Sequence, residues 1–291
     1  MLFLCRLVAA LPLSALQSLG ALLARVAFAV AGGERRRLDE NLRRAGYSDP
    51  AIRRAVIEES GKTLLELPWI WLRPQEEIVK LVREVVNPEL FLQAKARGKG
   101  IVFLTPHLGC FEVSAQFAAS HSPITVMYRP PRQRVLEPLL RAGRARGDIR
   151  IATADRKGVF TLLRALRNGE TVGILPDQVP SRGEGEWADF FGRPAYTMAL
   201  ASRLIDATGA SAILAFCERL PRAAGYRIHL TTLPDREQGE TAARQLNRAL
   251  EGLIRQKPEQ YLWSYNRYKV PPGVAPPAAS SAAPDVDTGG A

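Results

Sequence analysis

The chain has 291 residues, of which 46% are hydrophobic and 24% charged, a composition typical of a globular protein. This composition excludes a disordered chain, a collagen-like chain and a protein with many membrane spans. Forty Lys and Arg against 29 Asp and Glu give a net charge of +11, which leaves nucleic acid, anionic lipid or an acidic protein as partners. Three cysteines are too few and too scattered for a disulfide framework or a zinc ribbon, which indicates a reducing compartment.

The N-terminal segment is an uncharged apolar run over residues 7–24, about as long as a membrane-spanning helix requires. Arg6 precedes the run and Ala27-Phe28-Ala29 resembles a cleavage site, so a cleaved signal peptide is one alternative and a buried helix another. Arg25 within the segment argues against cleavage. We predict an uncleaved membrane anchor over residues 1–31, either spanning the bilayer or lying in it. Basic residues placed directly after such an anchor indicate that the rest of the chain is cytoplasmic. These are Arg35, Arg36, Arg37, Arg43 and Arg44.

Residues 32–98 are predicted to form a mostly helical segment packed on the main domain. Ser48-Asp49-Pro50 is an N-terminal helix signal, and residues 51–67 have the apolar spacing of a helix. Pro68 is expected to end this helix, just before Trp69 and Trp71.

Residues 99–270 alternate short apolar runs with helical patterns, which predicts one α/β domain with a largely parallel central sheet flanked by helices. The expected strands are 101–104, 124–128, 149–152, 171–175, 212–216 and 226–230. The expected helices are 112–120, 135–146, 159–168, 198–208 and 241–256. Residues 271–291 are rich in Pro, Ala, Ser and Gly and are predicted to be a disordered tail.

His107 lies in the turn after the first expected strand of this domain, and Glu112 begins the next helix. A separation of five residues sets two side chains roughly 140° apart on a regular helix, so they meet only if Pro106 and Gly109 turn the chain back. A carboxylate that orients an imidazole makes it a competent general base near neutral pH. The alternative is a structural histidine at the end of a strand.

Other catalytic motifs are absent from the sequence. It contains no His-Glu-x-x-His zinc motif, no phosphate-binding Gly-x-x-x-x-Gly-Lys loop and no Gly-x-Ser-x-Gly elbow. Cys110 is either a nucleophile beside His107 or a small apolar residue that packs the turn.

Two features downstream suggest binding. Residues 129–150 carry seven arginines against two acidic residues. This charge indicates either a patch that binds phosphate groups or an acidic carrier protein, or a basic face exposed to solvent. Few aromatic residues accompany them, so a stacking platform for nucleic acid is not evident. Asp177 follows an apolar strand, where sites of α/β proteins collect, although a turn or cap acid is as ordinary.

Together these residues resemble the late acyltransferases of lipid A biosynthesis, which have a glycerolipid-acyltransferase-like fold. The resemblance extends to about residue 270, and Pro-Glu-Gln-Tyr-x-Trp is its most specific element. The matching stretches are Arg35–Arg44 with Asn41-Leu42, His107–Glu112, Tyr128-Arg129-Pro130, Gly143–Arg146, Asp155–Gly158, Pro176-Asp177-Gln178, Phe190-Phe191-Gly192, Pro258–Trp263 and Arg267-Tyr268-Lys269. One departure is Tyr265-Asn266, where relatives often carry His-Arg, and it puts acceptor or chain-length preference in doubt.

The resemblance implies that His107 is the general base and Glu112 its partner. It also implies a functional Arg, which is Arg144 or Arg146, and a functional Asp177. Arg129, in the matching Tyr-Arg-Pro stretch, is expected to bind substrate. The implied reaction moves a fatty acyl chain from acyl carrier protein to a hydroxyl of a lipid A precursor, on the cytoplasmic side of the bacterial inner membrane. Nucleic acid is not an expected partner.

Phe190 and Phe191, with Trp187 nearby, are predicted either to line an acyl groove or to pack in the core. No metal or other cofactor is expected, because the acyl carrier protein thioester is itself the co-substrate. Two other functions remain open. A glycerophospholipid acyltransferase shares the His-x4-Asp pair but usually adds a Glu-Gly-Thr-Arg type motif, which is absent here. A basic, membrane-anchored binding protein explains the charge but leaves His107 without a role.

Overall fold

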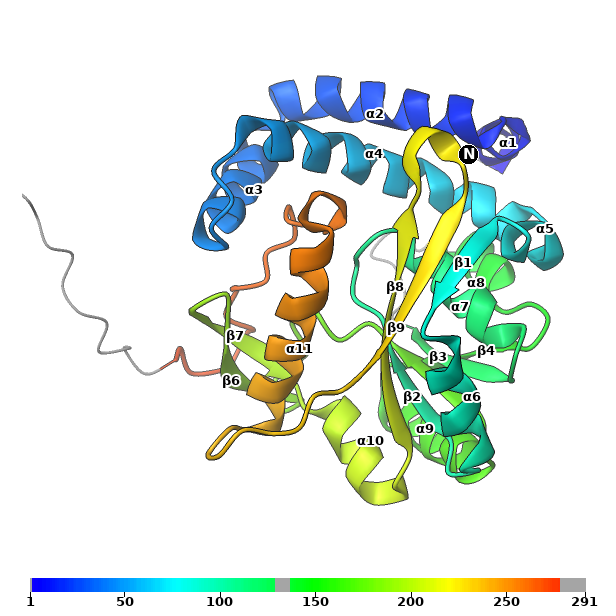
Figure 1. Cartoon of the computed structure of the whole chain (residues 1–291). Helices are drawn as coiled ribbons and strands as arrows, with labels where there is room; N and C mark the ends of the chain where they lie inside the picture. The colour runs from blue at the N-terminus through cyan, green and yellow to red at the C-terminus, as the bar shows by residue number, and fades with distance from the viewer. Residues whose placement is uncertain (1, 129–136, 278–291) are drawn as a thin grey trace, which may run out of the picture.

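The computed structural model of the chain describes residues 2–128 and 137–277 (Figure 1). Its centre is a seven-stranded sheet in which only one pair of neighbours, β8 and β9, is antiparallel. The strands in spatial order are β1 (Val82–Val86), β9 (Tyr226–Thr232), β8 (Ser211–Arg219), β2 (Ile101–Leu104), β5 (Thr171–Ile174), β3 (Ile124–Tyr128) and β4 (Ile149–Thr153). The predicted α/β class with a largely parallel sheet is confirmed.

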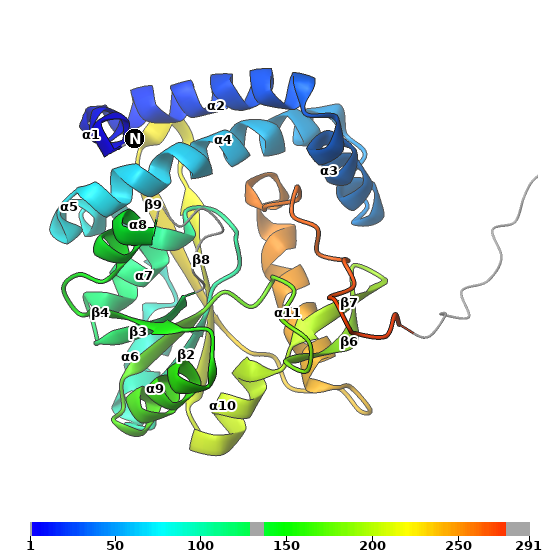
Figure 2. The same ribbon diagram turned by 180° about the vertical axis from the view of Figure 1, so that it is seen from behind.

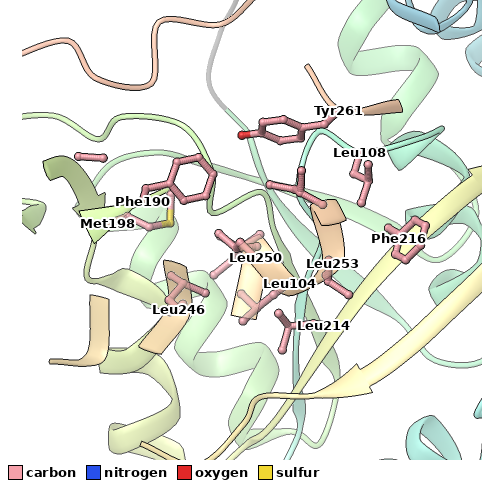
Figure 3. Packing of buried hydrophobic residues seen from close by; sticks show 14 of the residues in the cluster. Leu104, Leu108, Phe190, Met198, Leu214, Phe216, Leu246, Leu250, Leu253 and Tyr261 are labelled. Carbon is pink, nitrogen blue, oxygen red and sulfur yellow. The ribbon is translucent and has the colours of Figure 1, made fainter. Parts of the chain in front are cut away.

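Helices cover both faces of this sheet, and the alternation of side chains along the strands divides the core in two. From β2, Ile101 and Phe103 pack with α6 and α7, whereas Val102 and Leu104 pack with α9, α10 and α11. Figure 3 shows this second cluster, with Leu104 beside Leu250 and Leu253 of α11. The helices are α6 (Pro88–Ala96), α7 (Phe111–Ala119), α8 (Glu137–Arg144), α9 (Arg156–Arg167), α10 (Leu200–Thr208) and α11 (Ala242–Gln256).

A separate two-stranded hairpin, β6 (Gly185–Phe190) with β7 (Arg193–Met198), packs against α11. The sequence analysis did not predict these strands. Their turn is Phe191-Gly192, and both residues have positive φ (48° and 70°), as a tight hairpin turn requires.

The N-terminal helices form a layer over one end of the sheet (Figures 1 and 2). Within it, α2 and α4 lie side by side, and at their crossing a Cβ on Gly61 would be 2.0 Å from the carbonyl oxygen of Gly20. The layer consists of α1 (Leu2–Ala10), α2 (Leu13–Val30), α3 (Gly32–Arg44), α4 (Pro50–Leu72) and α5 (Gln75–Val79).

The flanking segments differ from the sequence prediction at Pro68 and contain a strand within the helical segment. The predicted helix break at Pro68 is wrong, because α4 continues to Leu72. The segment 32–98, expected to be mostly helical, consists of α3 to α6 and the short strand β1, which pairs with β9 at the edge of the sheet. Of the predicted tail, residues 271–277 are described, and the Trp187 indole donates to the carbonyl of Ala275 at 3.0 Å. Residues 278–291 lie outside the described part.

By length and composition, α2 is the one helix in the described residues that could cross a membrane. Its mean hydropathy is 1.6, and 22% of its residues are buried in the protein. A candidate membrane helix is therefore present where the sequence analysis expected one.

The contact between Gly20 and Gly61 gives a test of the helical layer. We expect Gly61→Ala to destabilise the fold by about 1–3 kcal/mol, because the methyl group forces the helices apart. The matched control is Gly252→Ala in α11, where a Cβ meets nothing within 4 Å. The control should be neutral or stabilising, by up to about 1 kcal/mol. Thermal unfolding followed by circular dichroism measures both, and a Gly61→Ala protein that melts like wild type contradicts this packing.

Candidate active site

The turn that carries His107 connects β2 to α7 at the carboxyl end of the parallel strands. Gly109 has φ +63°, and a Cβ there would lie 1.9 Å from the carbonyl oxygen of Cys217. The next amide, of Cys110, donates to that same oxygen at 2.8 Å. Glycine is therefore required both for its backbone conformation and for the close approach to β8.

The C-terminal segment 258–263 supports this turn from a distance of about 150 residues along the chain. The amide of Gly109 donates to the carbonyl of Gln260 at 3.0 Å, and that of Leu262 donates to the carbonyl of His107 at 3.1 Å. The side chain of Gln260 in turn accepts from the Arg219 amide at 2.9 Å and donates to the Arg219 carbonyl at 3.0 Å. The Pro-Glu-Gln-Tyr-x-Trp stretch thus fixes the backbone of the histidine turn.

The imidazole of His107 is held by Asp177. Its Nδ1 lies 2.9 Å from one carboxylate oxygen, and the His107 backbone amide donates to the other at 2.9 Å. Asp177 follows β5, the neighbour of β2, so adjacent parallel strands bring together residues 70 positions apart. With the carboxylate as acceptor, the proton sits on Nδ1, and Nε2 carries the lone pair that can accept a hydrogen bond or a proton.

Two effects compete at the Asp177 carboxyl. Burial by itself raises the pKa, but the charge of His107 and its two hydrogen bonds act in the opposite direction. The net pKa of Asp177 lies below its ordinary value. The group is therefore ionised across the neutral range, as a partner for imidazolium must be.

Two neighbours complete the surroundings of the ring. The side-chain amide nitrogen of Gln178 lies 3.2 Å from His107 Nε2 and can donate to its lone pair. The Phe111 ring stacks at an angle, with its centroid 4.8 Å from that of the imidazole. The His107 side chain is 14% exposed, so the ring is shielded but accessible.

Glu112 is held by a different partner from the one the sequence suggested. Its carboxylate accepts two hydrogen bonds from the Arg144 guanidinium, of which that from Nε measures 2.8 Å. The expected contact with the His107 ring is not formed among the described residues, because Glu112 lies in the first turn of α7 and faces α8. The structure therefore contains two separate pairs, His107 with Asp177 and Glu112 with Arg144.

Arg144 and Arg146, which the sequence could not separate, have different surroundings. The Arg144 guanidinium lies over the rings of Trp71 and Tyr128, at 5.5 and 5.9 Å from their centroids. It lines a small, mainly apolar cavity of about 40 Å³, together with Glu112, Phe111, Thr105 and Met127. Arg146 instead donates to the carbonyls of Ile70, Trp71 and Arg73 at the end of α4, and burial lowers its pKa. Of the two, Arg144 is the one beside the histidine turn.

A larger apolar groove opens between α9 and α10, with a volume of about 490 Å³. Met127 lines both this groove and the smaller cavity, and Pro180 in its wall is two residues beyond Gln178. Its apolar lining is Met127, Ala154, Val159, Phe160, Leu163, Pro180, Met198, Leu200, Leu204 and Ala207. A cavity of this size and polarity is typical of a site for a small apolar ligand.

The remaining predicted site residues lie elsewhere. Phe190 and Phe191 are packed in the core, where Phe191 lies 5.4 Å from Trp263, and neither lines the two cavities above. Arg129 lies outside the described residues.

Burial raises the pKa of the Cys110 thiol well above its ordinary value, with Glu66 adding to the effect, so it is protonated and inert as a nucleophile. Within the described residues, no group of three metal-binding side chains is close enough to hold an ion.

A buried ionic cluster behind the turn was missed by the sequence analysis. The Arg219 guanidinium donates to Glu66 at 2.6 Å, to Thr63 at 2.7 Å and to the Gly109 carbonyl at 3.1 Å. Glu59 lies 3.3 Å away. The only sequence signal for this cluster was a charged residue, Arg219, at the end of an apolar strand. Its carboxylate partners lie on a helix about 150 residues earlier in the chain, so no local pattern connects them.

A histidine at the carboxyl end of a parallel strand, bonded to a buried carboxylate and near an apolar cavity, is an arrangement typical of an α/β enzyme. Sequence comparison gives the family. The model of the bacterial lipid A biosynthesis acyltransferases matches residues 1–270, and the chain belongs to this family.

Individual relatives agree with this assignment. The chain is 27% identical over 223 residues to the lipid A biosynthesis lauroyltransferase of Escherichia coli (strain K12), covering 75% of this chain and 72% of that one. It is 26% identical to the palmitoleoyltransferase of the same organism (73% and 69% covered) and 23% identical to its myristoyltransferase (73% and 68%). The predicted family is confirmed, and it supports acyl transfer in lipid A biosynthesis.

The lowered pKa of Asp177 gives a pH test. A carboxyl with a depressed pKa contributes stability above its unfolded pKa, near the ordinary value of 3.8, and loses it as the pH falls through the folded value. Asp177→Asn should therefore lower the melting temperature at pH 6 and make it less steeply dependent on pH below about 4. If the melting temperatures of wild type and variant fall by the same amount between pH 6 and pH 2.5, the pairing of Asp177 with His107 is contradicted.

Proposed function

We propose that this protein transfers a fatty acyl chain from acyl carrier protein to a hydroxyl group of a lipid A precursor, with His107 as general base. The observation that carries the proposal is the His107–Asp177 pair, which makes Nε2 the proton acceptor of a turn whose flanking residues Thr105 and Phe111 line an apolar cavity. Membership of the lipid A acyltransferase family supplies the acceptor class. The acyl carrier protein donor rests on the resemblance and on the charge of +11, which suits an acidic carrier.

The chemistry follows from the position of the two nitrogens. Nε2 of His107 takes the proton from the acceptor hydroxyl while its oxygen attacks the thioester carbonyl carbon. The tetrahedral intermediate then collapses, the carbon–sulfur bond breaks, and the imidazolium returns the proton to the thiolate of the carrier. Asp177 keeps Nδ1 protonated and stabilises the imidazolium, as carboxylates do in other general-base histidine sites. Such base catalysis contributes about 10²–10⁴ in rate.

In this proposal Glu112 positions Arg144 and does not act on His107. It accepts both bonds from Arg144 on a single oxygen and so fixes the guanidinium against Trp71 and Tyr128. Arg144 remains 25% exposed, which leaves N–H groups for the carbonyl oxygen that gains charge in the transition state. The proposal thus assigns proton transfer to His107 with Asp177, and charge stabilisation to Arg144 held by Glu112.

The groove between α9 and α10 is the proposed site of the acyl chain. It is lined by apolar side chains, it shares Met127 with the Arg144 cavity, and Pro180 connects its wall to the Asp177–Gln178 strand end. Its charged lining consists of two basic residues, Arg156 and Arg203, and two acidic residues, Asp155 and Glu184. We place this reaction on the cytoplasmic side of the inner membrane, where the N-terminal helices attach the enzyme.

The reaction and the base can be tested together. Purified protein is incubated with acyl carrier protein thioesters of several chain lengths and either a tetra-acylated lipid A precursor or a lysophospholipid. We expect a mass gain of one acyl chain on the lipid A precursor. The rate should fall at least 100-fold in His107→Ala and by a comparable factor in Asp177→Asn, because the latter favours the wrong tautomer.

The matched control for these variants is His229→Ala. His229 also donates to a carboxylate, that of Glu218 at 2.8 Å, but it lies on β9, two strands away from the strand that leads to His107. Its rate should stay within a few-fold of wild type. Full transfer by a folded His107→Ala protein overturns the mechanism. Transfer only to the lysophospholipid keeps the mechanism and replaces the acceptor, and no transfer at all favours a binding protein.

The groove predicts a change in chain length. Ala207→Trp introduces a large ring at the exposed rim, where it can fill the groove without disturbing the core. We expect the preferred thioester to become shorter, with the rate for the shortest active chain nearly unchanged. Ala96→Trp, at the exposed end of α6, is the matched control. An unaltered chain-length profile in the Ala207 variant rules the groove out as the acyl site.

A further inference from the structure

The outer face of α2 is an exposed apolar stripe. Leu22, Val26 and Val30 are 54%, 61% and 83% exposed, and Leu19 and Leu23 are exposed on the same face. Their spacing of three and four residues keeps all five on one side of the helix. This side points away from the protein, since α2 packs on α4 through the opposite side (Figures 1 and 2). A row of large apolar side chains so exposed requires a partner.

The inner face of α2 is fixed to α4 by polar contacts along its length. The Gln17 amide donates to the buried carboxylate of Glu66 at 2.8 Å, and Arg25 pairs with Glu58 at 2.8 Å. Between these contacts the backbones meet at Gly20 and Gly61. The helix is therefore an integral part of the folded domain over about two turns, from Gln17 to Arg25.

These contacts decide between a helix that crosses a bilayer and one that lies in its surface. The 18 residues of α2 are about 27 Å long, short of the roughly 30 Å hydrocarbon core. If α2 crossed, α4 would enter the bilayer with it, together with Glu58, Glu59, Lys62 and Glu66. Burying these charges in hydrocarbon is costly, so the packing favours an in-plane position.

A basic hollow at the C-terminal end of the stripe indicates the charge of the partner. It has a volume of about 580 Å³, lies between α2, α3 and α4, and has no carboxylate among its lining residues in the described part of the chain. Its lining consists of Arg25, Phe28, Ala29, Arg35, Pro50, Arg53, Arg54 and Ile57. Arg25 and Arg53 are paired with Glu58 and Asp39, respectively, but the hollow stays positive. Guanidinium groups in this number suit phosphate oxygens.

We propose that α2 docks on the surface of an anionic phospholipid bilayer, parallel to its plane, with the stripe in the acyl-chain boundary and the arginine hollow around lipid phosphates. The partner combines the two chemistries present on this side of the molecule, an apolar layer and a layer of negative charge. This docking does not depend on the proposed reaction. It places the helical layer, and not a spanning anchor, against the membrane.

Flotation of the full-length protein with vesicles tests the surface. Wild type should bind vesicles that contain 30 mol% phosphatidylglycerol in phosphatidylcholine at least tenfold more tightly than pure phosphatidylcholine. Leu22→Glu with Val26→Glu should weaken binding to both at least tenfold, whereas Arg35→Gln with Arg54→Gln should remove mainly the preference for the anionic lipid. Leu92→Glu is the matched control, because Leu92 is equally exposed (58%) but lies on α6. Circular dichroism checks that each variant is folded.

Two results overturn the docking surface. One is binding by the Leu22/Val26 variant that equals that of the Leu92 control. The other is a change of oligomeric state in that variant without vesicles, which assigns the stripe to a second copy of the chain.

The orientation is tested by cysteine labelling in a Cys5→Ser background, in which Cys110 and Cys217 are buried. Ser14→Cys and Gly33→Cys mark the two ends of α2, and both positions are exposed. An in-plane helix requires a membrane-impermeant maleimide to label both sites in inverted inner-membrane vesicles and neither in spheroplasts. Labelling of Ser14→Cys in spheroplasts, or its absence in inverted vesicles, overturns the in-plane position.

Discussion

The buried guanidinium of Arg219 is the contact on which the rest of the structure depends. It joins the end of β8 to Glu59 and Glu66 of α4 and to the Gly109 carbonyl of the histidine turn. Burial alone lowers the pKa of Arg219, but the carboxylates, Glu66 above all, outweigh it and raise the pKa, so the group stays charged. Removing one partner would leave a buried charge uncompensated, which typically costs about 3–5 kcal/mol. The helical layer and the histidine turn are thus held by one set of hydrogen bonds.

The histidine turn has little regular structure of its own, and its precision comes from remote segments. Cys217 on β8, Gln260 and Leu262 near the C-terminus, and Asp177 after β5 each bond to one part of it. These segments lie 70 to 155 residues beyond the turn in sequence. Because these contacts exist only in the complete fold, folding itself makes the site rigid. Its hydrogen bonds are preorganised and do not require a loop to move.

The sequence predicted those elements whose signal is local. The expected strands 101–104 and 124–128 match β2 and β3 because short apolar runs followed by turn residues are characteristic of buried parallel strands. The hairpin of β6 and β7 was missed because its burial comes from packing on α11, not from alternation in its own sequence. The helix through Pro68 was missed because tertiary contacts of Trp69 and Ile70, both buried, outweigh the local cost of proline.

The same distinction explains the partner of His107. Spacing drew attention to Glu112, which is local, whereas the ring is bonded to Asp177, which only the pairing of β2 with β5 brings near. A carboxylate five residues along, at the start of a helix, faces that helix's neighbour and not back toward the strand, and here the neighbour is α8 with Arg144. The five-residue spacing of His107 and Glu112 therefore reflects two separate contacts, that of His107 with Asp177 and that of Glu112 with Arg144. In the proposed mechanism, the strand end presents the base, and the helix start holds the guanidinium that stabilises the negative charge on the carbonyl oxygen.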